Sequence, residues 1–192
     1  MALTDIGLCA RALVRLGAAP ITSFDDDTAE SEIANALYAP VRDALLSAYP
    51  WTFATGQIEM TKLNDAPVAD YQNAFQLPLD FLRAISAGYG GSQGQNGRGL
   101  NYRISRGQLH TNAESVVLTY IYRTEEESFP PFFDMALIAQ LSAEFCIPVT
   151  ESTSRSTALA KSAKAEFIRA RQVDAQQDSP NRLEHFNLID VR

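Results

Sequence analysis

A long helical pattern over residues 28–53 constrains this chain more than any other stretch. Its apolar residues recur every four positions, which places them on one face of a helix over about residues 28–49: Ile33, Leu37, Val41 and Leu45. Thr28 can cap the N-terminus of this helix, and Tyr49-Pro50-Trp51 ends it because proline disfavours the α conformation in the residue before it. Trp51 and Phe53 then predict an aromatic anchor that joins the next segment to the helical face.

Pro40 lies inside this pattern and leaves two interpretations open. A proline in a helix interior removes one backbone hydrogen bond and clashes with the preceding turn, at a cost of roughly 3 kcal/mol. The stretch is therefore either two helices, 28–39 and 40–49, or one kinked helix.

Three further helices are predicted, over about residues 4–16, 131–146 and 152–177. The last two have apolar stripes of four-residue spacing, and Ile147-Pro148 is expected to end the first of them: the stripes are Phe133, Leu137, Leu141 and Phe145, then Leu159, Ala163, Phe167 and Ala170. Met135, beside the first stripe, is expected to fill the core.

Residues 55–123 have the alternating pattern of strands and predict an inserted antiparallel β-sheet. Arg106-Gly107 lies between two short strand patterns and indicates a tight hairpin turn. Val116 to Tyr122 is apolar on both faces, so we expect a central strand. The expected fold class is α+β: residues 1–54 and 124–178 form a helical body, 55–123 a β domain, and 179–192 a C-terminal tail.

Composition narrows the classes of function. The net charge of −7 and the pI of about 4.8 argue against a protein that grips nucleic acid by neutralising phosphates, although an acidic wall suits passage of DNA without sticking. The mean hydropathy of −0.13 and the N-terminus argue against a membrane span and a signal peptide, so we expect synthesis in the cytoplasm. Cys9 and Cys146 are expected to be buried thiols.

No pattern in the sequence specifies a reaction, so we expect no enzyme, metal or cofactor. His110 and His185 have no ligand partner at metal spacing, and the Asp25–Asp27 run is better explained as a loop with a helix cap than as a metal site. Glu125–Glu127 is expected to solvate a connector, and Arg42 with Asp43 to form a surface ion pair or a subunit contact.

Two segments are candidates for contacts with other molecules. The glycine-rich stretch 88–99 lacks the features of a phosphate loop and is expected to be a hairpin tip, either simply flexible or in contact with a partner. The tail after Pro180 has apolar residues that either fray or dock on a neighbour. The expected interface residues in these segments are Tyr89, Arg98, Phe186, Leu188 and Ile189.

Several short motifs, in this order along the chain, resemble the head-to-tail adaptor (connector) family of tailed phages, of the tail tubular protein A type. Each is weak alone, and their order and spacing together carry the resemblance, which covers about residues 3–178: Leu13-x-x-Leu16-Gly17-Ala18-x-Pro20-Ile21, Asp25–Asp27, Tyr38-x-Pro40-Val41-Arg42-Asp43-x-Leu45-Leu46, Tyr49-Pro50-Trp51-x-Phe53-Ala54, Leu77-Pro78-x-Asp80-x-Leu82-Arg83, Tyr120-x-Tyr122-Arg123, Phe132 to Ala143 and Ala170-Arg171-x-x-Asp174-Ala175.

The resemblance implies a helical body with an inserted sheet and a homo-oligomeric ring, usually a dodecamer, in the virion. Such a ring lies below the portal protein and above the tail nozzle or tube, is assembled in the host cytoplasm, and lets DNA pass without specific binding or any membrane. Because some relatives have been proposed to degrade peptidoglycan, a tail-associated cell-wall hydrolase is the alternative function. A DNA-binding packaging factor is a third hypothesis, against which the acidic pI argues.

Overall fold

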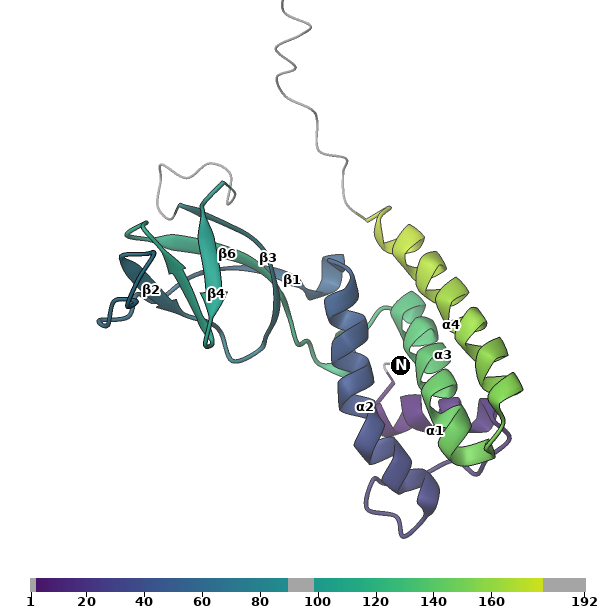
Figure 1. Ribbon diagram of the computed structural model, residues 1–192. Helices are drawn as coiled ribbons and strands as arrows, with labels where there is room; N and C mark the ends of the chain where they lie inside the picture. Colours follow the sequence, from purple (N-terminus) through teal and green to yellow (C-terminus); the bar gives the residue numbers. More distant parts are fainter. Residues whose placement is uncertain (1–2, 90–98, 178–192) are drawn as a thin grey trace, which may run out of the picture.

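The computed structural model describes residues 3–89 and 99–177, and within them the chain has an α+β fold with two lobes (Figure 1). The helical lobe contains α1 (Asp5–Arg15), α2 (Ala29–Ala48), α3 (Pro131–Thr150) and α4 (Thr153–Asp174). The β lobe contains β1 (Thr55–Glu59), β2 (Asn73–Gln76), β3 (Phe81–Tyr89), β4 (Tyr102–Ser105), β5 (Gln108–Thr111) and β6 (Val116–Tyr122). Short 3₁₀ turns at Thr52–Ala54 and Glu126–Ser128 flank the β lobe.

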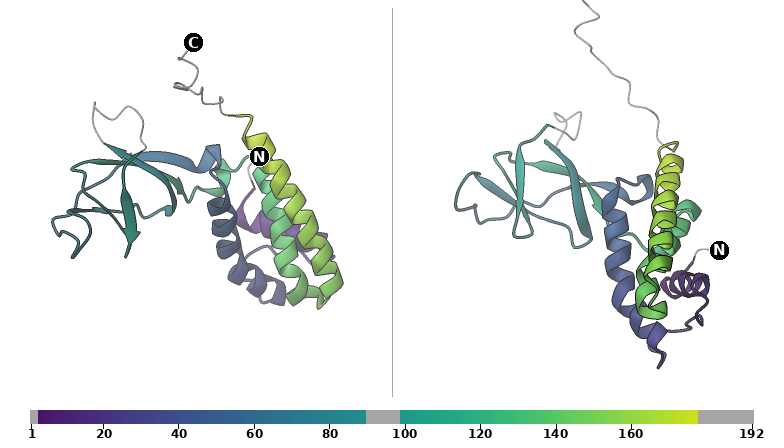
Figure 2. Two further views of the ribbon diagram at one scale, coloured as in Figure 1. Left: turned by 45° about the horizontal axis from the view of Figure 1, so that its top comes forward. Right: turned by 45° about the vertical axis from the view of Figure 1, so that its right-hand side comes forward.

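Helix α3 is the centre of the helical lobe, because it packs against α1, α2 and α4 (Figures 1 and 2). Helices α2 and α4 run in the same direction and α3 runs opposite to both (Figure 1). By length and composition α3 is also apolar enough to cross a bilayer, with a mean hydropathy of 1.4. More than half of that window is buried among the other helices, as is usual for the core helix of a folded domain.

Helix α2 is a single helix, with Pro40 inside it, which decides between the two interpretations of this stretch. Thr28 caps it, as expected, and its hydroxyl oxygen accepts a hydrogen bond from the Ser31 amide at 3.2 Å. Pro40 is on the exposed side, where water can satisfy the carbonyl that its missing N–H leaves free. The predicted stripe lies at the edge of the buried face: Leu45 is buried, whereas Ile33, Leu37 and Val41 are half-buried.

The predicted end of the third helix at Ile147-Pro148 is wrong, since α3 continues to Thr150. Pro148 is exposed, so its missing hydrogen bond leaves no buried group without a partner. The helix ends at Glu151, which has a left-handed φ of 52° and donates its amide to the Ile147 carbonyl at 2.9 Å. Met135, expected in the core, is 48% exposed, and that prediction is also wrong.

The β lobe consists of two antiparallel three-stranded sheets and not of one, which corrects the prediction of a single inserted sheet. Their strand orders are β1-β6-β3 and β2-β5-β4. The central position of β6 and the Arg106-Gly107 hairpin turn between β4 and β5 are confirmed, and both turn residues have positive φ, 50° and 72°. Strand β3 extends to Tyr89, so the first two residues of the expected tip belong to a strand.

Each lobe has its own hydrophobic core, and Trp51 anchors the first of them as predicted. Its side chain is fully buried, and its indole N–H donates to the Leu45 carbonyl at 3.1 Å. The ring meets five aromatic rings at centroid distances of 5.1 to 6.4 Å: Tyr49, Phe53, Phe132, Phe133 and Phe167. The end of α2, the start of α3 and the middle of α4 therefore converge on one residue, immediately before the chain enters β1.

Candidate functional site

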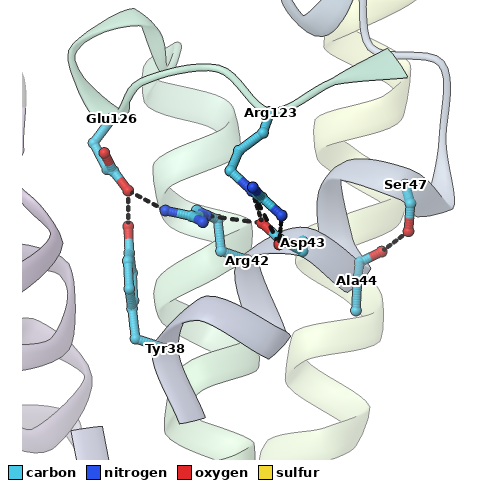
Figure 3. Close-up of polar contacts among 7 residues, drawn as sticks. All are labelled: Tyr38, Arg42, Asp43, Ala44, Ser47, Arg123 and Glu126. Atoms are coloured by element: carbon cyan, nitrogen blue, oxygen red, sulfur yellow. Dashed lines mark hydrogen bonds and ion pairs between the residues drawn. The ribbon is translucent and has the colours of Figure 1, made fainter. Parts of the chain in front are cut away.

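A group of polar side chains lies where the helical lobe meets the β lobe, and we call it the junction cluster (Figure 3). Helix α2 contributes three of its members and the connector from β6 to α3 contributes two: Tyr38, Arg42, Asp43, Arg123 and Glu126. Glu126 Oε1 accepts hydrogen bonds from the Tyr38 hydroxyl at 2.7 Å and from Arg42 Nη1 at 2.8 Å. Asp43 accepts from Arg42 Nε at 3.0 Å and from Arg123 Nη2 at 2.6 Å.

The charges of the junction cluster stabilise one another. Burial alone would raise the pKa of the Glu126 and Asp43 carboxyls. Hydrogen bonds from Tyr38 and Arg42 to Glu126, and from Arg123 and Arg42 to Asp43, outweigh burial and hold both pKa values below their usual range. Burial and the bond to Glu126 raise the pKa of Tyr38, so its phenol stays protonated and remains a donor. Both carboxylates are therefore charged at neutral pH, and the cluster is a structural brace with no group held near neutrality for proton transfer.

The junction cluster extends into the β lobe through the main chain. The Arg123 amide donates to the Asp80 carbonyl at 2.8 Å, and the Tyr120 hydroxyl donates to Asp80 Oδ1 at 3.3 Å. On the other crossing between the lobes, the Thr52 amide and hydroxyl donate to the Asp174 carboxylate at 3.1 and 2.8 Å. Both chain crossings between the lobes are thus fixed by carboxylates.

The structure places the predicted interface residues in different environments. Arg42 and Asp43 do form an ion pair, but their side chains are only 15% and 25% exposed and belong to the junction cluster, so they are not simply a surface pair. Tyr89 is 57% exposed at the end of β3. Arg98, Phe186, Leu188 and Ile189 lie outside the described residues, as does most of the expected glycine-rich tip.

Sequence reasoning missed Glu126. It was expected only to solvate a connector, yet its carboxylate pairs with a residue 84 positions earlier in the chain. The one local signal for Glu126 in the sequence is its position shortly before a helix that begins at a proline. That signal does not identify Tyr38 and Arg42 as its partners.

An apolar groove opens on the surface between α2 and α4, with α3 as its floor. It encloses about 750 Å³ and is lined mainly by apolar side chains, among them Leu37, Val41, Leu45, Ile147, Ala160 and Phe167. Glu144 and Lys164 give it one charge of each sign. Leu37 and Val41, two of the half-buried residues of the α2 stripe, line this groove and also pack against the core of the helical lobe.

The acidic and thiol side chains of residues 3–89 and 99–177 that could bind a metal or react lie apart from one another. No cluster of His, Cys, Asp and Glu there could hold a metal ion, and the side chain of Asp26 is satisfied by the Thr22 and Ser23 amides at 2.8 and 3.0 Å, as expected of a loop. Cys9 and Cys146 are buried free thiols, as predicted, and burial raises the pKa of Cys9 to about 12. Such a thiol stays protonated and unreactive at neutral pH.

Asp134 is an exception, because it is a buried carboxyl without a compensating partner. It lies in the first turn of α3, is 9% exposed, and its Oδ1 has no hydrogen-bond partner in the described part of the chain. Burial raises its pKa to about 6, against a smaller opposite effect of Arg11. A raised pKa occurs in catalytic acids, but Asp134 lines none of the described surface pockets that we identify. We therefore treat it as a cost to stability.

No protein-family model matches this sequence, and no curated protein matches it either.

Proposed function

We propose that this chain is a structural head-to-tail adaptor of a tailed phage or phage-like particle. In this role copies of the chain form a ring, twelve in the form that the motif resemblance implies, between a portal protein and a tail nozzle or tube. DNA passes through the ring during packaging and ejection. The protein would be assembled in the host cytoplasm and remain in the virion.

One observation carries the proposal: motifs that resemble the adaptor family, far apart in the sequence, meet in the fold. Arg42 and Asp43 come from one motif, Asp80 from a second and Arg123 from a third. Arg123 joins the other two through its side chain on Asp43 and its amide on Asp80. Residues that form one brace between two lobes have a shared structural reason to occur together, which supports treating the motifs as one pattern.

The brace also suits a mechanical role. An adaptor must hold two binding surfaces at a fixed orientation, one for the part above and one for the part below. Partly buried, mutually paired charges favour one orientation of the lobes, because another orientation would separate the partners. A net charge of −7 is also compatible with a channel that does not retain DNA.

Mass photometry with the portal protein encoded in the same genome tests the proposal. Twelve copies of the 21.1-kDa chain would add about 250 kDa to a portal ring. The matched pair of variants is Arg123→Ala, which opens the junction cluster, and Arg103→Ala, which opens an exposed ion pair with Asp70 inside the β lobe. We expect Arg123→Ala to reduce loading of the portal and Arg103→Ala to leave it unchanged.

Three results would contradict the proposal. One is a wild-type chain that adds no mass to portal or nozzle at any concentration. Another is a wild-type chain that clears a turbid suspension of purified peptidoglycan, together with a variant that has one carboxylate replaced and does not clear it. That result would favour the hydrolase. The last is tight DNA binding with a steep dependence on salt, which would favour a packaging factor.

A further inference from the structure

The groove between α2 and α4 is an apolar surface that the described residues leave uncovered. Ile147 on its floor is 53% exposed, and alanines on both walls are exposed to solvent. Exposing apolar surface to water costs a free energy of about 25 cal/mol for each Å². Small alanine side chains also allow a second segment of chain to approach the helices closely.

We propose that residues 182–191 of the same chain occupy this groove. Half of these ten residues are large and apolar: Leu183, Phe186, Leu188, Ile189 and Val191. The segment also contains Arg182 and two acidic residues, Glu184 and Asp190, and the groove offers Lys164 and Glu144 as partners of opposite sign. The segment and the groove therefore agree in apolar character, and each carries charges of both signs.

The length of chain after α4 is sufficient for this return. The groove follows α4 from Phe167 back to Ser156, which at 1.5 Å per residue lies about 10 to 27 Å from the helix end at Asp174. Fifteen residues from 178 to 192 span up to about 50 Å when extended. The first four are Asp-Ser-Pro-Asn, a composition typical of a turn, as a reversal requires.

A contact within one chain is favoured over one between two copies in solution. A segment tethered by a few residues has an effective concentration in the millimolar range, far above that of a second copy in a dilute sample. The proposal does not depend on the adaptor function, because it concerns a single chain before any assembly.

Photo-crosslinking of the full-length protein tests this contact. Phe186 is replaced by p-benzoyl-phenylalanine, the sample is irradiated, and the crosslinked peptides are mapped by mass spectrometry. We expect crosslinks to residues 37–48 or 156–167 in the monomer band, with a yield that does not change on dilution.

Two arginine substitutions on α4 provide the matched control. Ala160→Arg fills the groove, whereas Ala165→Arg places the same side chain at an exposed position that does not line it. We expect Ala160→Arg to lower the crosslink yield about tenfold, a loss of about 1.4 kcal/mol of contact free energy. Ala165→Arg should leave the yield unchanged. Melting curves of both variants check that the fold is intact, and Ala44→Arg on the opposite wall replaces Ala160→Arg if the latter fails to fold.

Three outcomes would overturn the proposal. Crosslinks outside the groove, or none, would show that the segment does not occupy it. Crosslinks that appear only in a dimer band and increase with concentration would assign the groove to a second copy. Equal yields in the two α4 variants would show that the groove does not hold the segment.

Discussion

Replacing Asp134 by asparagine should stabilise the protein at neutral pH, and the structure allows the size of the effect to be worked out. The Asp134 carboxyl is buried without a hydrogen bond to Oδ1, and burial raises its pKa from 3.8 to about 6. A shift of one pKa unit corresponds to 1.36 kcal/mol, so ionising this group in the folded state costs about 3 kcal/mol at most. Asparagine has nearly the shape of the protonated acid and never ionises.

Two effects reduce this maximum. Asp134 keeps 9% exposure, so water screens part of its charge. A negative charge in the first turn of a helix is also favourable by about 0.3–1 kcal/mol, and asparagine loses that interaction. We therefore expect a net gain of about 1–2 kcal/mol for Asp134→Asn at pH 8, or about 3–6 °C in melting temperature for a chain of this size.

The pH dependence identifies the cause. The folded state holds the proton of Asp134 more tightly than the unfolded state does, so the stability from protonation is complete below about pH 4 and is lost as pH rises through 6. Urea denaturation of both proteins between pH 4 and pH 8 should give equal free energies of unfolding at the acidic end and a growing advantage for asparagine above it. Asp65→Asn, which removes the same charge from an exposed loop, should change stability by less than about 0.5 kcal/mol. A variant less stable than the wild type at pH 8, or a difference constant across the pH range, would refute the reasoning.

Three further substitutions test other parts of the structure. Trp51→Ala should lower the free energy of unfolding by about 3–5 kcal/mol, and Trp51→Phe by less, because phenylalanine keeps one aromatic ring and loses the second ring of the indole and its hydrogen bond to the Leu45 carbonyl. An unchanged melting temperature of the alanine variant would show that the aromatic anchor is not needed. Glu126→Gln should cost about 1–3 kcal/mol at pH 7 because Arg42 loses one of its two carboxylate partners and keeps only Asp43. The depressed pKa of Glu126 gives the wild type stability that is present above about pH 4 and lost below it. The difference in free energy of unfolding between the wild type and Glu126→Gln, measured by urea denaturation, should therefore become smaller in acid. A difference that does not change with pH would contradict the role of Glu126 as a charged partner of Arg42. Pro40→Ala should restore a backbone hydrogen bond and raise the melting temperature. The net gain in free energy of unfolding should be about 1–2 kcal/mol, because the unfolded chain also gains conformational freedom when the proline is removed. A lower melting temperature would mean that the packing of α2 needs the proline.

Local signals predicted the helices and strands well where the responsible interactions are themselves local. Thr28 caps α2 because its side-chain oxygen reaches an amide three residues away. Arg106-Gly107 forms the hairpin turn because the backbone conformation that it needs depends on these two residues. The exceptions are the two prolines, Pro40 and Pro148, whose effect depends on which side of the helix faces water.

The surfaces could not be predicted in the same way. The four-residue spacing of α2 identified an apolar stripe but not what it faces, and Leu37 and Val41 line a groove because α4 lies across from them and not against them. Met135 is exposed for a related reason: neighbouring positions on α3 differ in whether another helix covers them. The number of helices around α3 and their placement depend on the whole chain.

The sequence by itself determined the α+β class, the order of the elements, the central strand β6 and the aromatic anchor at Trp51, because hydrophobic periodicity, caps and turns act over a few residues. Only the tertiary structure decided that the strands form two sheets, that Glu126 braces the lobes through Arg42 and Tyr38, and that a groove stays open between α2 and α4. Most of these features join residues that are far apart in the chain, as Tyr38 and Glu126 are, and their formation depends on how separate elements pack, which no local pattern records.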